Sequence, residues 1–238
     1  MKLASIVALA LCGFALITST GVRADDDVVS GFSIDEPNGP EITPTMLAKS
    51  RGLSIAHADA LLHNAADPSA GSPLATVVLV DFMDFKCPLS ERMDPTIQAL
   101  VAANPSFRVV FKIVPIHGEV SVFAAKAALA AKLQGKYLEY HKALMKAGKT
   151  LTHESIIAIA KGLGIDTNKL KSDMNSPEIA EQLDANMKLF HAVGLFGTPD
   201  LLFVKYNLTT RAKNNDVVLM LGEFAQPELQ NVVDDLIQ

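Results

Sequence analysis

The sequence predicts an α/β domain that carries an inserted helical subdomain. Two valine-rich runs, residues 75–83 and 107–114, have the length and the apolar character of strands buried inside a sheet. The residues between them have a helical pattern, and a strand, a helix and a strand at this spacing form a βαβ unit. Two further strands, residues 201–206 and 217–221, follow only after a long stretch that reads as helices.

The first 24 residues have the pattern of a secretory signal peptide. A positive start at Lys2 precedes an uncharged apolar run over residues 3–17, and small residues lead to a cleavage site after Ala24. An uncleaved anchor helix is the alternative, but the run is shorter than the about 20 residues that span a bilayer. We therefore expect an exported, periplasmic protein and leave outer-membrane association or secretion open.

The number of cysteines is informative in an exported chain. Cleavage would discard Cys12 and leave Cys87 as the single cysteine. An unpaired cysteine in such a protein indicates an intermolecular disulfide or a reactive thiol, whereas an inert buried cysteine is the alternative. The formal charge of −5 and the lack of a basic stripe argue against binding to nucleic acid.

The chain divides into five predicted parts. After the signal peptide, residues 25–73 form an N-terminal extension: a flexible lead-in to residue 44, a helix from there to about residue 66, and a linker over residues 67–73. The helix either packs on the domain or serves as an arm for homo-oligomerisation. The remaining parts are a first α/β segment (74–118), a helical insertion (119–193) and a second α/β segment (194–238) with a polar turn over 209–215.

The helices expected within the insertion follow the spacing of apolar residues and the punctuating glycines. They span residues 120–135, 136–146, 152–163 and 177–193, with a short one over 166–174 and a last helix, outside the insertion, over 227–236.

Cys87 lies where a predicted strand passes into a helix. The thiolate is the reactive form of cysteine, and a helix N-terminus or a neighbouring cation favours it. Pro88 sets the helix start, Lys86 is adjacent in sequence, and the Ser90 hydroxyl lies one turn on, where it could donate a hydrogen bond to the sulfur. These features favour a reactive thiol over an inert one.

Ser90 occupies the position at which a Cys-x-x-Cys motif has its second cysteine. That second thiol normally attacks a mixed disulfide and releases the client. Serine cannot do so, and the mature chain cannot form an internal disulfide. Release then requires a second client cysteine or a small thiol such as glutathione. The sequence thus favours isomerisation, reduction or covalent holding of clients over autonomous oxidation.

Several fragments in order resemble the DsbA-like family of periplasmic thiol–disulfide exchange proteins, and its outer-membrane or secreted branch most of all. They include residues 84–88, 115–118 and 197–199, and the resemblance covers roughly residues 60–235. It implies a thioredoxin-like fold with an inserted helical domain, and a redox centre at residues 87–90. It also implies that Thr198 and Pro199 form a cis-proline loop that lies against the cysteine and binds the client backbone.

The chain departs from the family at Ser90 and at Leu89, where histidine or tyrosine is usual. The predicted catalytic residues are Cys87 and Ser90, and the predicted client-binding residues are Pro88, Leu89, Thr198 and Pro199. Partners would be cysteine-containing exported proteins, glutathione or a membrane redox partner.

Two function classes remain open from the sequence. The first is a monothiol isomerase or reductase of protein disulfides. The second is a redox-inactive chaperone or client-binding scaffold on the same fold. The histidines show no ligand spacing, so we expect no metal and no cofactor.

Overall fold

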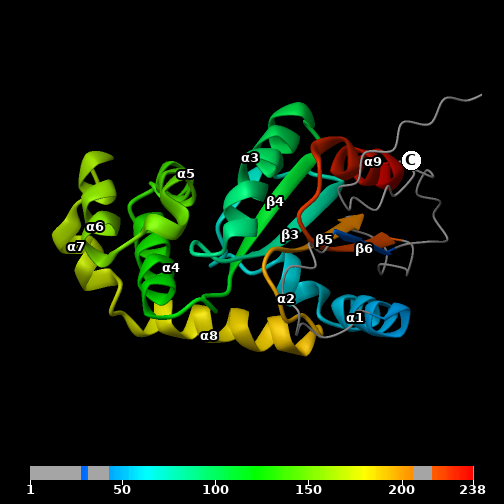
Figure 1. Cartoon of the computed structure of the whole chain (residues 1–238), viewed down its shortest axis with the longest axis horizontal. Helices are drawn as coiled ribbons and strands as arrows, with labels where there is room; N and C mark the ends of the chain where they lie inside the picture. Colours follow the sequence, from blue (N-terminus) through cyan, green and yellow to red (C-terminus); the bar gives the residue numbers. More distant parts are fainter. Residues whose placement is uncertain (1–27, 32–42, 206–215, 238) are drawn as a thin grey trace, which may run out of the picture.

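The predicted βαβ unit forms the centre of the molecule in the computed structural model, which describes residues 28–31, 43–205 and 216–237. Strands β3 (Val77–Met83) and β4 (Phe107–Ile113) pair in parallel, and helix α3 (Pro88–Ala103) connects them. Every side chain of β3 is buried because helices cover both faces of the sheet (Figure 1).

The second α/β segment completes the sheet. Strand β5 (Asp200–Lys205) runs antiparallel to β3, and β6 (Val217–Gly222) runs antiparallel to β5. The six strands lie in the order β1-β6-β5-β3-β4-β2. Strands β3, β4, β5 and β6 begin and end within two residues of the predicted limits, because each is an apolar run buried on both faces.

Two short edge strands were not predicted. Strand β1 (Val28–Gly31) lies in the expected flexible lead-in and pairs in parallel with β6. Strand β2 (Ser69–Gly71) lies in the expected linker and pairs with β4. Gly71 allows this approach, since its φ is +99° and a Cβ there would collide with the Phe107 carbonyl. The predictions of a lead-in and a linker were wrong at these residues.

The predicted N-terminal helix is two helices. Thr43 is the N-cap of helix α1 (Pro44–Ala56), and its hydroxyl accepts a hydrogen bond from the Met46 amide. Helix α2 (Ala58–Leu62) follows after His57. Apolar residues of both helices are buried in the core on this side of the sheet: Leu47, Leu61 and Leu62. This packing matches the first of the two interpretations given to the helix, and oligomerisation through it stays a prediction.

The residues between β4 and β5 form helices, as expected. They are α4 (Glu119–Lys132), α5 (Tyr137–Ala147), the 3₁₀ helix η1 (Gly148–Thr150), α6 (His153–Gly162), α7 (Thr167–Asp173) and α8 (Pro177–Ala192). The predicted start at Thr152 is a capping box, in which Thr152 and Ser155 each accept the other's backbone N–H. Helix α9 (Gln226–Ile237) ends the fold.

Helices α3 and α9 cover one face of the sheet, and α1, α2 and α8 cover the other (Figure 1). Each face has its own apolar core, and the larger one continues into α4–α7. Helix α8 then returns the chain from this helical block to the start of β5.

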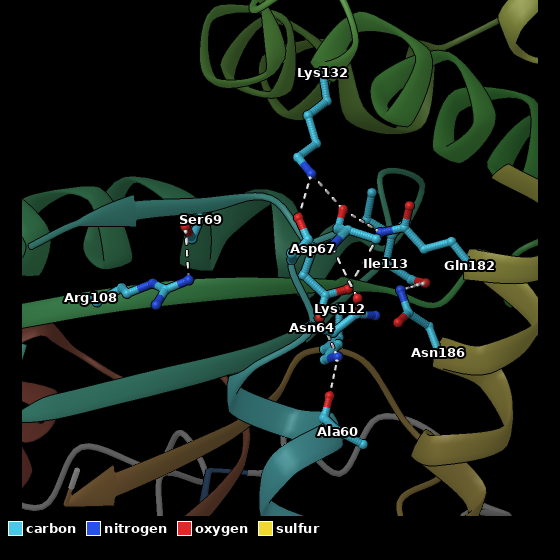
Figure 2. A network of polar contacts seen from close by, with 12 residues as sticks. Ala60, Asn64, Asp67, Ser69, Arg108, Lys112, Ile113, Lys132, Gln182 and Asn186 are labelled. Atoms are coloured by element: carbon cyan, nitrogen blue, oxygen red, sulfur yellow. Dashed lines mark hydrogen bonds and ion pairs between the residues drawn. The ribbon is translucent and has the colours of Figure 1, made fainter. Parts of the chain in front are cut away.

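A buried polar network holds the segment between α2 and β2 (Figure 2). The Lys112 ammonium on β4 forms an ion pair with Asp67 and donates to the Ala60 carbonyl at 2.7 Å, and both charged side chains are only 1% exposed. Lys132 of α4 and Gln182 of α8 donate to the Ala66 carbonyl at 2.8 and 2.7 Å. The network ties the N-terminal extension to the sheet and to the helical block.

The predicted signal peptide (1–24) and the predicted polar turn (209–215) lie outside the described residues. Within the described part, none of the helices has the length and apolar character needed to cross a bilayer.

Candidate functional site

Cys87 is the N-cap residue of α3, and Pro88 is its first helical residue. The thiol donates a hydrogen bond from Sγ to the Thr198 carbonyl at 2.9 Å. Cys87 is 4% exposed, so its side chain is buried. The sulfur is therefore held at the start of a helix against a loop from the far end of the domain.

That loop contains the second predicted group of site residues. The peptide bond between Thr198 and Pro199 is cis, as the family resemblance implies. The Pro199 carbonyl accepts a hydrogen bond from the Gly222 amide at 2.9 Å, which fastens the loop to the end of β6. Pro88 is exposed and Leu89 half-buried. The structure thus brings Cys87 next to Thr198, with Pro88 and Leu89 following it on α3.

Ser90 is buried on the first turn of α3, and its recorded contact differs from the one predicted. Its hydroxyl oxygen accepts a hydrogen bond from the Asp84 amide at 3.4 Å. The expected donation to the Cys87 sulfur is not among the contacts of these two described residues. Ser90 therefore helps to hold the turn before the cysteine.

The Lys86 ammonium is bound by two backbone carbonyls. It donates to the carbonyl of Lys149 in η1 at 2.6 Å and to that of Leu151, which follows η1, at 3.5 Å. The side chain therefore joins the turn before Cys87 to the helical block. The recorded partners of the Lys86 ammonium are thus these two carbonyls.

Asp84 organises the turn before Cys87, a role that was not predicted from the sequence. Its carboxylate accepts hydrogen bonds from the Ser121 hydroxyl at 2.6 Å, the Ile116 amide at 2.7 Å and His117 Nδ1 at 2.9 Å. Burial acts to raise the pKa of Asp84, but the hydrogen bonds from His117 and Ser121 and from the Lys86 amide hold it below its usual range. A buried, ionised carboxylate thus fixes the chain three residues before Cys87.

Two more buried carboxyls lie behind the site, on β3 and α3. Asp81 is 3% exposed, and its Oδ1 has no hydrogen-bond partner among the described residues. Burial, and then the charges of Asp94 and Asp200, raise its pKa well above the usual range. Asp94 instead has a partner, since His141 Nε2 lies 2.8 Å from its Oδ1 and His141 Nδ1 lies 3.1 Å from the Tyr137 hydroxyl.

The histidines have structural contacts. His117 is paired with Asp84, His141 is buried beside Asp94, and His153 stacks on Phe123 with ring centroids 4.3 Å apart. Within the described ranges, no three His, Cys, Asp or Glu side chains converge as a metal site would require.

Comparisons with known proteins agree with this geometry. The family model of the DSBA-like thioredoxin domain matches residues 78–218, which is more than half of the chain. A thioredoxin-like oxidoreductase from Silicibacter pomeroyi is 36% identical, with a TM-score of 0.63, over 74% of this chain and 95% of that one. The catalytic domain of Proteus mirabilis ScsC is 27% identical, with a TM-score of 0.67, over 79% and 99%.

Among curated proteins, a Na(+)/H(+) antiporter NhaA of Salinispora tropica is 27% identical over 125 residues. These cover 50% of this chain and 19% of the antiporter, so the chain spans about a fifth of that relative's length. The matched residues, the shared fold and the cysteine placed against a cis-proline loop together assign the chain to the family of DSBA-like thioredoxin-domain proteins.

Proposed function

We propose that this chain is an exported thiol–disulfide exchange protein that acts through Cys87 alone, as an isomerase or reductase of protein disulfides. One observation carries the proposal: the Cys87 sulfur lies at the N-terminus of α3, 2.9 Å from the Thr198 carbonyl, with serine where a second thiol would release the client. The signal-like residues 1–24 support export.

Two neighbours of the sulfur favour opposite protonation states: the Thr198 carbonyl favours the thiol, and the start of α3 favours the thiolate. As a thiol it donates to the Thr198 carbonyl. As a thiolate it loses that bond and faces the unpaired amides of the first turn of α3, where the helix dipole stabilises negative charge. Loss of the proton therefore weakens the contact with the loop and prepares the sulfur for attack.

Isomerisation of a client disulfide needs no added oxidant or reductant, because the number of disulfide bonds stays the same. The Cys87 thiolate attacks one sulfur of a client disulfide, a new S–S bond forms, and the other client sulfur leaves as a thiolate. A different client thiolate then attacks the client sulfur of the mixed disulfide. This step restores the Cys87 thiolate and leaves the client with a rearranged disulfide.

Reduction uses the same first step followed by a small thiol. Glutathione thiolate attacks the client sulfur, regenerates the Cys87 thiolate and leaves a glutathionylated client, which a second glutathione reduces while oxidised glutathione forms. Ser90 takes no part in either sequence, because a hydroxyl cannot replace the resolving thiol.

The second candidate is a redox-inactive chaperone. The 4% exposure of Cys87 favours it, since a covered sulfur reacts slowly. Refolding of scrambled ribonuclease in glutathione buffer separates the two. We expect the wild type to speed the return of ribonuclease activity and Cys87→Ala to lose that effect. Equal rescue by both proteins would reject the exchange function and support the chaperone.

A further inference from the structure

Asp200 is a buried carboxyl that follows Pro199 directly and begins β5. It is 4% exposed and forms no ion pair with any of the described residues. Its Oδ2 accepts a hydrogen bond from the Gly197 amide at 3.4 Å. A carboxyl in this place caps the backbone of the segment before the cis-proline.

The backbone of Asp200 is itself held firmly. In the sheet it lies opposite Phe82 of β3 on one side and Leu221 of β6 on the other. Because this backbone is fixed in the sheet, the Asp200 carboxyl is a firmly placed hydrogen-bond acceptor. The loop over residues 196–199 is therefore fastened at two places: by the Asp200 carboxyl before Thr198, and by the Gly222 amide on the Pro199 carbonyl after it.

We propose that Asp200 is a positioning residue for the exchange at Cys87. By binding the Gly197 amide, its carboxyl keeps the adjoining Thr198 carbonyl against the Cys87 sulfur and the loop in the shape that a client backbone meets. The inference rests on the proposed exchange function. It adds to the site a residue that touches neither the sulfur nor the client.

The neutral form of the side chain is sufficient for this role. Burial raises the pKa of Asp200 to about 8, so the carboxyl is mainly protonated near neutral pH. A protonated carboxyl keeps an oxygen that accepts from backbone amides. Asparagine has the same shape and the same acceptor, whereas leucine has neither acceptor nor charge.

The test compares Asp200→Asn with Asp200→Leu in the full chain. One readout is the rate at which Cys87 forms a mixed disulfide with a peptide disulfide, and another is its alkylation by iodoacetamide. We expect Asp200→Leu to slow reaction with the peptide about tenfold, because small displacements of positioning groups cost this much or more. Alkylation needs no contact with the loop and should not slow. Asp200→Asn should restore the rate with the peptide.

Two controls separate positioning from loss of stability. Leu202→Ala removes buried apolar volume from the same face of β5 and leaves the Asp200 acceptor in place. This variant should therefore form the mixed disulfide with the peptide as fast as the wild type. The nuclear magnetic resonance signal of the Gly197 amide should shift in Asp200→Leu and stay in Asp200→Asn. If Asp200→Leu does not fold, Asp200→Ala replaces it.

The outcomes are distinguishable. If the wild type forms no mixed disulfide, the proposed function fails. The Gly197 amide signals of the two Asp200 variants then still show whether the Asp200 carboxyl holds the loop in place. If Asp200→Leu reacts with the peptide as fast as the wild type, or if Leu202→Ala slows the reaction equally, the positioning role of Asp200 is overturned.

Discussion

The Cys87 sulfur and the Thr198 carbonyl lie 2.9 Å apart although 111 residues separate them in the chain. The helix start that carries the sulfur and the loop that carries the carbonyl come from the two α/β segments on either side of the helical block. The first consequence concerns Ser90, one helical turn from the sulfur.

Ser90→Cys should restore an internal disulfide. Residue 90 is buried on the first turn of α3, three residues after Cys87, and cysteine is close to serine in size. We expect oxidised glutathione to give a bond between residues 87 and 90 in this variant. Peptide mapping by mass spectrometry locates the bond. The control Arg92→Cys lies further along α3 and is exposed, so it should give glutathione adducts. Persistent adducts in Ser90→Cys would contradict the placement.

Lys86→Met should leave the reactivity of Cys87 unchanged, because the Lys86 ammonium binds the carbonyls of Lys149 and Leu151. We expect alkylation rates within about twofold of the wild type, since a cation already held by two carbonyls contributes little to stabilising the thiolate. Loss of the hydrogen bonds should lower the free energy of unfolding by about 1 kcal/mol. Lys161→Met, at an exposed position on α6, is the control. Alkylation about tenfold slower in Lys86→Met would show that the ammonium acts on the sulfur.

Lys112→Met should strongly destabilise the fold. The variant leaves the Asp67 carboxyl buried without its cation, and breaking a buried pair on one side costs about 3–5 kcal/mol. Urea unfolding measures the loss. The double variant Lys112→Met with Asp67→Leu should recover most of it, because no unpaired charge remains. A double variant as unstable as the sum of the single variants would show that the two side chains do not interact.

Asp200 should give stability a defined dependence on pH. Its pKa is about 8 when folded and about 3.9 in an unfolded chain. Between these values the folded state binds more protons, so the free energy of unfolding falls as pH rises, by up to about 1.4 kcal/mol per pH unit for one carboxyl. Asp200→Asn does not ionise. Its stability relative to the wild type should therefore increase from about pH 5 to about pH 8.

The contribution of Asp84 to the free energy of unfolding changes with pH in the opposite direction, so Asp84 serves as the control. Because its folded pKa is lowered, its contribution to stability is present above the unfolded value and is lost as pH falls through the folded one. Asp84→Asn should lose stability near neutral pH and not in strong acid. A stability difference for Asp200→Asn that stays constant with pH would contradict a raised pKa.

The sequence predicted the parts of this structure that follow from local pattern. The runs that became β3 and β4 are long and apolar, and Pro88 marks the start of α3 directly after Cys87. The order of short motifs identified the loop at Pro199.

The parts that escaped prediction depend on long-range contacts. Strand β2 is three residues long in a segment rich in proline and glycine, and it exists because β4 offers an edge. Most donors to the Asp84 carboxylate lie more than 30 residues away in the chain. The contacts of the Lys86 ammonium are the carbonyls of Lys149 and Leu151, more than 60 residues away. No local pattern reports such partners.

The most direct measurement compares the rate at which oxidised glutathione forms a mixed disulfide with Cys87 in the folded protein and in the urea-unfolded protein. Peptide mapping by mass spectrometry locates the adduct, because Cys12 is the other cysteine of the chain. We predict a faster reaction in the folded protein, since the start of α3 favours the thiolate, and full release by reduced glutathione. A folded protein that reacts more slowly than the unfolded chain would show Cys87 to be an inert buried cysteine.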